Sequence, residues 1–119
     1  MPKFVLIAED NVVMRRIIRI ELEEAGLAVC GEAVDGIDAI EKASAFAPDV
    51  IILDLAMPRM NGIDAARVLS RICPHARVVL HTNHADALRS QSALPDGVTE
   101  VVAKGENLVG RILHLVQAA

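Results

Sequence analysis

Five polar side chains in this sequence are suited to holding a phosphoryl group or a divalent cation, and they follow strand-like apolar runs. They are the carboxylates of Glu9, Asp10 and Asp54, the hydroxyl of Thr82 and the ammonium group of Lys104. In an open α/β sheet, the ligand site lies outside the carboxyl ends of the strands. Residues spread over nearly the whole chain are therefore predicted to meet at one edge of a sheet.

Carboxylates gathered at one edge repel one another unless a cation or a raised pKa reduces their charge. At a separation of about 5 Å and an effective dielectric near 20, each pair costs roughly 3 kcal/mol. Mg²⁺ keeps several waters and takes one or two carboxylates together with phosphate oxygens. That preference suits the oxygen ligands expected here, namely Glu9, Asp10, Asp54 and the carbonyl of Ala56. Ca²⁺ requires more oxygen ligands than these residues offer, so Mg²⁺ is the predicted cofactor.

Unbroken β-branched runs alternate with amphipathic stretches along the chain, which is the pattern of buried strands and the helices that cover them. The predicted strands are residues 4–8, 27–32, 50–53, 77–81 and 99–103, and the predicted helices are residues 12–25, 36–46, 62–72, 84–93 and 106–117. Turn residues such as Gly26, Pro48 and Gly62 separate them. Strict alternation with right-handed crossovers predicts a doubly wound α/β fold around a five-stranded parallel sheet.

Length and composition narrow the class of protein. The 119 residues contain no linker-like stretch, so we expect a single domain over residues 1–119. The net charge of −4 argues against direct nucleic-acid binding, and we interpret Arg15, Arg16 and Arg19 as a solvated helix flank. The apolar runs are too short to cross a bilayer and no cleavable signal follows the first residues, so we expect a cytoplasmic protein that does not bind membranes.

Over its whole length the sequence resembles the receiver domains of two-component response regulators. The resemblance rests on Glu9-Asp10-Asn11, on the segment LDLAMPRMNG from Leu53 to Gly62, on Thr82, and on Gly97 followed by Lys104. It implies the flavodoxin-like strand order 2-1-3-4-5. The roles that it implies are phospho-acceptor for Asp54, Mg²⁺ ligands for Glu9 and Asp10, and phosphoryl ligands for Thr82 and Lys104.

The chemistry of these side chains agrees with those roles. Asp54 can act as a carboxylate nucleophile that attacks a phosphohistidine or an acyl phosphate in line, while Lys104 and the cation offset charge on the equatorial oxygens. The predicted function is a signalling module of a phosphorelay, with a sensor histidine kinase or phosphotransfer protein as its partner. It would not be an enzyme beyond catalysing its own phosphorylation and dephosphorylation.

Two further expectations concern how the receiver is used. Because the chain starts at Met1 and stops at the end of the last predicted helix, we expect a receiver that stands alone, although a domain cut from a longer regulator would look the same. The resemblance also leaves open a homodimer through the fourth helix, the fifth strand and the fifth helix, residues 84–93, 99–103 and 106–117.

Some residues depart from the receiver pattern and keep other functions open. Val101 stands where receivers usually carry a Tyr or Phe switch, and Gly105 stands where a proline is common. Both departures favour the main alternative, a receiver-fold interaction module that acts without phosphorylation. A phosphohydrolase is disfavoured because Ala56 supplies no second acid two residues after Asp54. A flavin module is disfavoured because no phosphate-binding loop follows the first strand.

The first predicted helix carries more apolar residues than one core contact requires. At about 100° per residue, two stripes roughly 130° apart emerge, with Met14, Ile18 and Leu22 in one and Val13, Ile17 and Ile20 in the other. Because Glu24 falls within the second stripe, that stripe is predicted to be exposed. It lies beside the Glu9-Asp10 end, where a phosphodonor must approach, so we expect Val13, Ile17 and Ile20 to bind a partner. The alternative is a broad apolar arc that packs deeper into the core.

Overall fold

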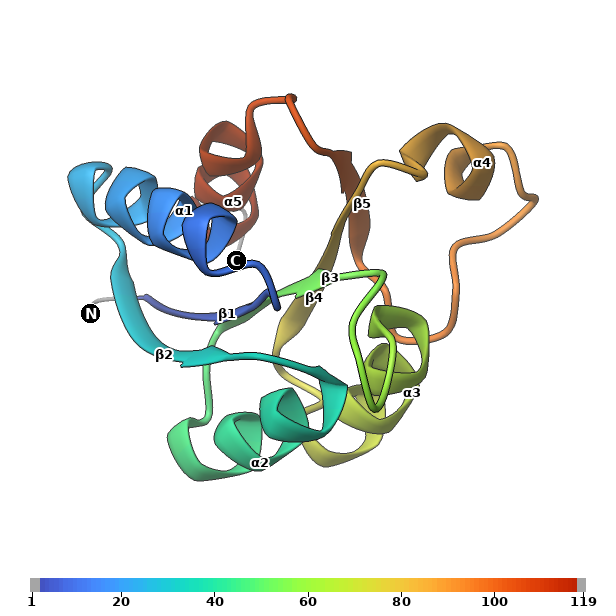
Figure 1. Ribbon diagram of the computed structural model, residues 1–119, viewed down its shortest axis with the longest axis horizontal. Coiled ribbons are helices and arrows are strands. Elements are labelled where there is room, and N and C mark those ends of the chain that lie inside the picture. The colour runs from blue at the N-terminus through green and yellow to red at the C-terminus, as the bar shows by residue number, and fades with distance from the viewer. Residues whose placement is uncertain (1–2, 118–119) are drawn as a thin grey trace.

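The computed structural model describes residues 3–117, in which five strands alternate with five helices (Figure 1). The strands are β1 (Phe4–Ala8), β2 (Ala28–Ala33), β3 (Val50–Asp54), β4 (Arg77–Thr82) and β5 (Glu100–Ala103). The helices are α1 (Val12–Glu24), α2 (Gly36–Phe46), α3 (Gly62–Ile72), α4 (Ala85–Arg89) and α5 (Leu108–Gln117). The strands form one parallel sheet in the order β2-β1-β3-β4-β5, which confirms the predicted fold class and strand order.

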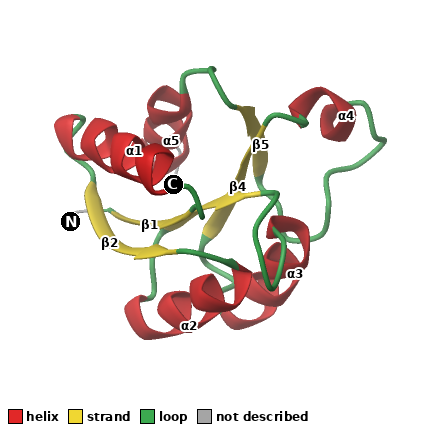
Figure 2. Cartoon of the chain, in the orientation of Figure 1, coloured by secondary structure: helices red, strands yellow, loops and turns green. Residues whose placement is uncertain are grey.

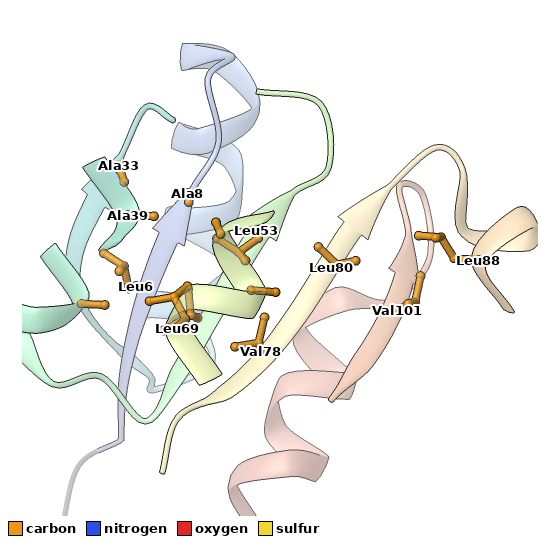
Figure 3. Packing of buried hydrophobic residues seen from close by; sticks show 14 of the residues in the cluster. Leu6, Ala8, Ala33, Ala39, Leu53, Leu69, Val78, Leu80, Leu88 and Val101 are labelled. Carbon is orange, nitrogen blue, oxygen red and sulfur yellow. The ribbon is translucent and has the colours of Figure 1, made fainter. Parts of the chain in front are cut away.

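Helices cover both faces of the sheet. Figure 1 shows α1 and α5 together on one face and α2 and α3 on the other, with α4 beyond β5, and Figure 2 shows the same layers by element type. Successive strand residues point to opposite faces. In β1, for example, Val5 and Ile7 belong to the apolar cluster under α1 and α5, whereas Leu6 belongs to the cluster over α2 and α3 drawn in Figure 3. Burial on both faces explains why the strand runs are apolar without alternation.

Three helices begin at side-chain caps, two of them within three residues of a strand end. Asn11 accepts a hydrogen bond from the backbone N–H of Met14 at 2.9 Å, and Asp35 and Asn61 accept equivalent bonds at the starts of α2 and α3. Each cap satisfies a backbone donor that the first helical turn leaves free. The loop after β1 is consequently short, and it keeps Glu9 and Asp10 close to the sheet.

The last two helices differ from the predicted ranges. The fourth helix was predicted over residues 84–93 but ends at Arg89, because residues 89–92 are polar and the next large apolar residue, Leu94, is itself exposed and buries no further turn. The fifth was predicted from residue 106 but begins at Leu108. The side chain of Glu106 instead accepts the backbone N–H of Ala103, and Asn107 accepts that of Gly110, so both residues lie before the helix.

Candidate functional site

The sheet register brings the predicted site residues to one edge. Ala8 lies opposite Leu53 across β1 and β3, so Glu9 and Asp54 follow on neighbouring strands. Thr82 lies opposite Ala103 across β4 and β5, so Lys104 follows next to it. The alignment of the parallel strands thus brings these residues to one edge, although they are far apart in the sequence.

Three carboxylates form a compact group at this edge. One ligand oxygen from each of Glu9, Asp10 and Asp54 lies within 4.8 Å of the other two. Glu9 and Asp54 are buried, whereas Asp10 is exposed, so the group opens to solvent on the Asp10 side. Hard oxygen ligands at this separation are those that Mg²⁺ prefers.

Lys104 is the cation nearest to these acids. Its Nζ lies 3.3 Å from Asp54 Oδ1 and 3.4 Å from Glu9 Oε1. Burial opposes the charged form of Lys104, but the carboxylates of Asp54 and Glu9 outweigh that effect and raise its pKa. The ammonium of Lys104 thus contacts two of the three carboxylates, which leaves the site short of positive charge.

The environment of Glu9 shows that the site fits a cation. Burial, together with the neighbouring Asp54, raises the pKa of Glu9 to about 7 against the opposing effects of the Asn11 N–H and Lys104. The N–H of Asn11 donates to Oε2 at 3.1 Å, while Oε1 is buried and has no hydrogen-bond donor within the described residues. The ammonium of Lys104 lies 3.4 Å from this oxygen without a hydrogen bond, so a divalent cation would provide a closer partner and would restore the ionised form of the carboxyl group.

Thr82 supplies a hydroxyl group at the same edge. The residue is buried at the end of β4, and its Oγ1 accepts the backbone N–H of His84 at 3.0 Å. That bond occupies one lone pair and leaves the hydroxyl proton available as a donor. Ala56, in contrast, lies exposed in the loop after β3 and can contribute only its backbone.

Close packing fixes the backbone of Asp54. Gly62 opens α3 against β3, and a Cβ built on Gly62 would lie 2.4 Å from the carbonyl oxygen of Asp54. The N–H of Gly62 also donates to the carbonyl of Leu55 at 2.9 Å. Glycine at this position therefore allows α3 to approach the residue that bears the central carboxylate.

Sequence reasoning misjudged Arg15 and overlooked the placement of His81. Arg15 was predicted to be solvated, but its guanidinium donates to Glu32 and to the carbonyl of Glu9, each at 2.8 Å. Arg19, one helical turn further along, donates to the same carboxylate at 2.5 Å, and no local sequence pattern signals either contact. His81 lies opposite Asp54 in the sheet, and burial, followed by the charge of Lys104, lowers its pKa to about 4, so the imidazole is neutral.

The second apolar stripe of α1 is exposed, as predicted. The exposed fractions of Val13, Ile17 and Ile20 are 63%, 44% and 48%, whereas Ile18 and Leu22 are buried against the sheet. With Val12 and Arg16, the three residues line a shallow hollow of about 320 Å³ on the outer face of α1. This surface stands next to the site edge because α1 begins directly after Asp10 and Asn11.

Comparison with known proteins identifies the family. The family model described as response regulator receiver domain matches residues 5–116. The chain belongs to the receiver family. The chemotaxis protein CheY of Thermotoga maritima is 34% identical over 104 residues, which cover 87% of each chain. The receiver domain of the putative response regulator NarL of Mycobacterium tuberculosis has the same fold, with a TM-score of 0.88 and 27% identity over 99% of this chain and 98% of that one.

Other relatives are much longer than this receiver. The protein-glutamate methylesterase/protein-glutamine glutaminase of Pyrococcus horikoshii is 48% identical over 71 residues, which cover 59% of this chain but only 19% of the relative. Receivers themselves are generally signalling modules rather than enzymes. They bind Mg²⁺ at an acidic pocket and interact with histidine kinases or phosphotransfer proteins. Among residues 3–117, no helix has the length and apolar character needed to cross a membrane.

Proposed function

We propose that this receiver accepts a phosphoryl group on Asp54 from a histidine kinase or phosphotransfer protein in the cytoplasm, and that Mg²⁺ is required. The observation that carries the proposal is the group formed by Glu9, Asp10 and Asp54, which is short of positive charge although Lys104 lies beside it. Beyond the transfer onto Asp54 and the hydrolysis that removes it, we propose no enzymatic activity for the single domain over residues 1–119.

Asp54 is proposed as the nucleophile. One carboxylate oxygen forms a bond to the phosphorus of the donor as the bond from phosphorus to the donor nitrogen or oxygen breaks, and the released donor group takes up a proton. Asp54 fits this role because Lys104 lies beside its carboxylate and because Gly62 fixes its backbone. Its neighbours Glu9, Asp10 and the carbonyl of Ala56 would hold the metal ion. When bound, Mg²⁺ offsets the charge of the acids and of the phosphoryl oxygens.

Lys104 and Thr82 are proposed to hold the transferred group. Lys104 already lies 3.3 Å from Asp54 Oδ1 and would form an ion pair with a phosphoryl oxygen on that carboxylate. Thr82 has a hydroxyl proton free to donate from the neighbouring strand. Because the site is complete in these residues, an interaction module that acts without phosphorylation, the alternative suggested by Val101 and Gly105, is not favoured.

The exposed stripe of α1 is proposed as the docking surface for the phosphodonor. Val13, Ile17 and Ile20 present apolar side chains around a hollow beside the site edge, and their burial in a complex would contribute about 25 cal/mol for each Å² covered. The homodimer through α4, β5 and α5 stays a prediction.

Labelling with a small acyl phosphate tests the proposal. Intact-mass spectrometry should show one added phosphoryl group in the presence of Mg²⁺ and none in EDTA. Asp54→Asn should not be labelled, and Asp10→Ala should be labelled far more slowly because its cation site is weakened. As a control, Asp64→Asn removes an exposed aspartate of α3 and should be labelled like the parent. Persistent labelling of Asp54→Asn would refute the assignment of the acceptor.

A further inference from the structure

Arg59 has an unusual backbone conformation in the loop between β3 and α3. Its φ of 63° lies in the left-handed region, which residues other than glycine, asparagine and aspartate rarely adopt. Such a conformation persists only where surrounding contacts stabilise it, and it recurs at functional sites. The loop in question is the one that carries Ala56, directly after Asp54.

A bidentate ion pair stabilises this conformation. The guanidinium of Arg59 donates to Asp35 through Nε at 2.7 Å and through Nη2 at 3.1 Å. Asp35 is buried, with 4% of its surface exposed, and it also caps α2 by accepting the N–H of Asp38. Hydrogen bonds from Arg59, followed by that from Asp38, lower the pKa of Asp35, so the acceptor is ionised. The pair thus joins the loop after β3 to the start of α2.

A second contact lies next to this pair. The N–H of Gly36 donates to the carbonyl of Met60 at 3.0 Å, and a Cβ built on Gly36 would lie 2.4 Å from that oxygen. At the other end of the loop, the N–H of Gly62 binds the carbonyl of Leu55 at 2.9 Å. Among residues 3–117, no backbone hydrogen bond is donated by Ala56 or Met57. The position of Ala56 therefore depends on the anchors that flank it.

We propose that Arg59 is a positioning residue for the metal site, because its ion pair with Asp35 holds the loop so that the carbonyl of Ala56 stays at the acidic edge. The inference rests on the proposed function, in which that carbonyl is a metal ligand. The Arg59 side chain is 57% exposed but that of Asp35 is only 5% exposed, so the pair also neutralises a buried charge. What the pair contributes to the metal site is geometry, since the planar fork of arginine binds a carboxylate in one orientation.

Two substitutions separate positioning from folding. Arg59→Gly removes the ion pair but tolerates the left-handed backbone, whereas Arg59→Ala removes the pair and leaves the strained conformation. Mg²⁺ alone is the probe, and its affinity is measured by isothermal calorimetry beside urea unfolding in EDTA. Arg67→Ala is the matched control, because Arg67 is an exposed arginine of α3 that pairs with Asp64 at 3.8 Å, away from the loop.

The expected result is a loss of affinity without an equal loss of stability. Arg59→Gly should bind Mg²⁺ about tenfold more weakly, as is typical when a residue that orients a metal ligand is removed. Its urea midpoint should fall less than that of Arg59→Ala, because glycine relieves the left-handed strain and so offsets part of the loss of the ion pair. Arg59→Ala should lose a similar amount of affinity and more stability, Arg59→Lys should bind weakly for lack of the fork, and Arg67→Ala should match the parent. Parent-like Mg²⁺ affinity in Arg59→Gly would overturn the inference alone. Absence of Mg²⁺ binding by the parent would overturn the proposed function and this inference with it.

Discussion

The charge of Glu9 should destabilise the metal-free protein near neutral pH. Glu9 is buried, its Oε1 lacks a hydrogen-bond donor within the described residues, and Asp54 lies beside it. The substitution Glu9→Gln keeps the size of the side chain and can still accept the N–H of Asn11, but it removes the charge. We therefore expect Glu9→Gln to be more stable than the parent in EDTA at about pH 8.

The magnitude follows from the raised pKa. Burial and Asp54 raise the pKa of Glu9 from 4.5 to about 7. A difference of one pKa unit corresponds to about 1.36 kcal/mol, so ionising Glu9 in the folded state costs about 3 kcal/mol. The attraction of Lys104, whose Nζ lies 3.4 Å from Glu9 Oε1, is already included in this pKa, which it lowers. The expected gain is therefore about 3 kcal/mol above pH 7.

The pH dependence has a definite sign. Between pH 4.5 and about 7 the folded protein keeps a proton on Glu9 that the unfolded chain releases, so the contribution of Glu9 to the stability of the parent falls as the pH rises through this window. Glu9→Gln has no such proton, so its advantage should vanish towards pH 4.5. The lowered pKa of His81 has the opposite effect on stability, but it is present in both proteins, so the difference between the parent and Glu9→Gln isolates the contribution of Glu9. Urea unfolding monitored by circular dichroism at several pH values measures both curves. Glu24→Gln, at an exposed position of α1, should stay within about 0.5 kcal/mol of the parent.

Addition of MgCl₂ provides the complementary measurement. Binding to the folded state alone adds about 1.4 kcal/mol for each factor of ten in the ratio of Mg²⁺ concentration to its dissociation constant. The parent should gain this stability, while Glu9→Gln, which has lost a charged ligand, should gain less, so the difference between them should shrink or reverse. If Glu9→Gln were less stable than the parent at pH 8 in EDTA, the account of Glu9 as an uncompensated buried acid would be wrong.

Three other outcomes follow from the packing and the surface. Gly62→Ala should destabilise the fold by about 1 to 3 kcal/mol and slow labelling of Asp54, because its Cβ would lie 2.4 Å from a backbone oxygen. In contrast, Gly110→Ala would meet the side chain of Asn107, which caps α5 but can shift, so the gain in helix propensity offsets part of the cost and the substitution should destabilise less than Gly62→Ala in urea unfolding. Equal effects of the two would refute the packing argument. Ile17→Ala should slow transfer of the phosphoryl group from a protein donor and leave labelling by a small acyl phosphate unchanged. The free energy of unfolding should change by less than about 1 kcal/mol, and a large loss would place Ile17 in the core. When beryllofluoride is added to mimic the phosphoryl group, amide chemical shifts should change more in α4 and after β5 than at Val101. The small side chain of Val101 has few rotamers to exchange, so large shifts at Val101 would contradict this expectation.

Much of this receiver could be predicted from local patterns. Apolar runs of strand length between amphipathic stretches set the order of elements, and a parallel sheet has only one edge at which strand ends can present ligands. Glu9, Asp54, Thr82 and Lys104 could therefore be placed together from the sequence. The exposed stripe of α1 was also predictable from a local pattern, because helical periodicity places Val13 and Ile17 on a different face of the helix from Ile18.

Only the tertiary structure decided how these residues interact. The contacts of Arg15 with Glu32, and of Arg59 with Asp35, join residues 17 and 24 positions apart, and local periodicity carries no information about such pairs. The raised pKa of Glu9 depends on burial and on a neighbour from another strand, neither of which a motif records. The early end of α4 likewise depends on tertiary packing, because a further turn would need apolar partners to bury it. Sequence determines which groups reach the edge, because that depends on local order, whereas their charge state and orientation depend on long-range packing.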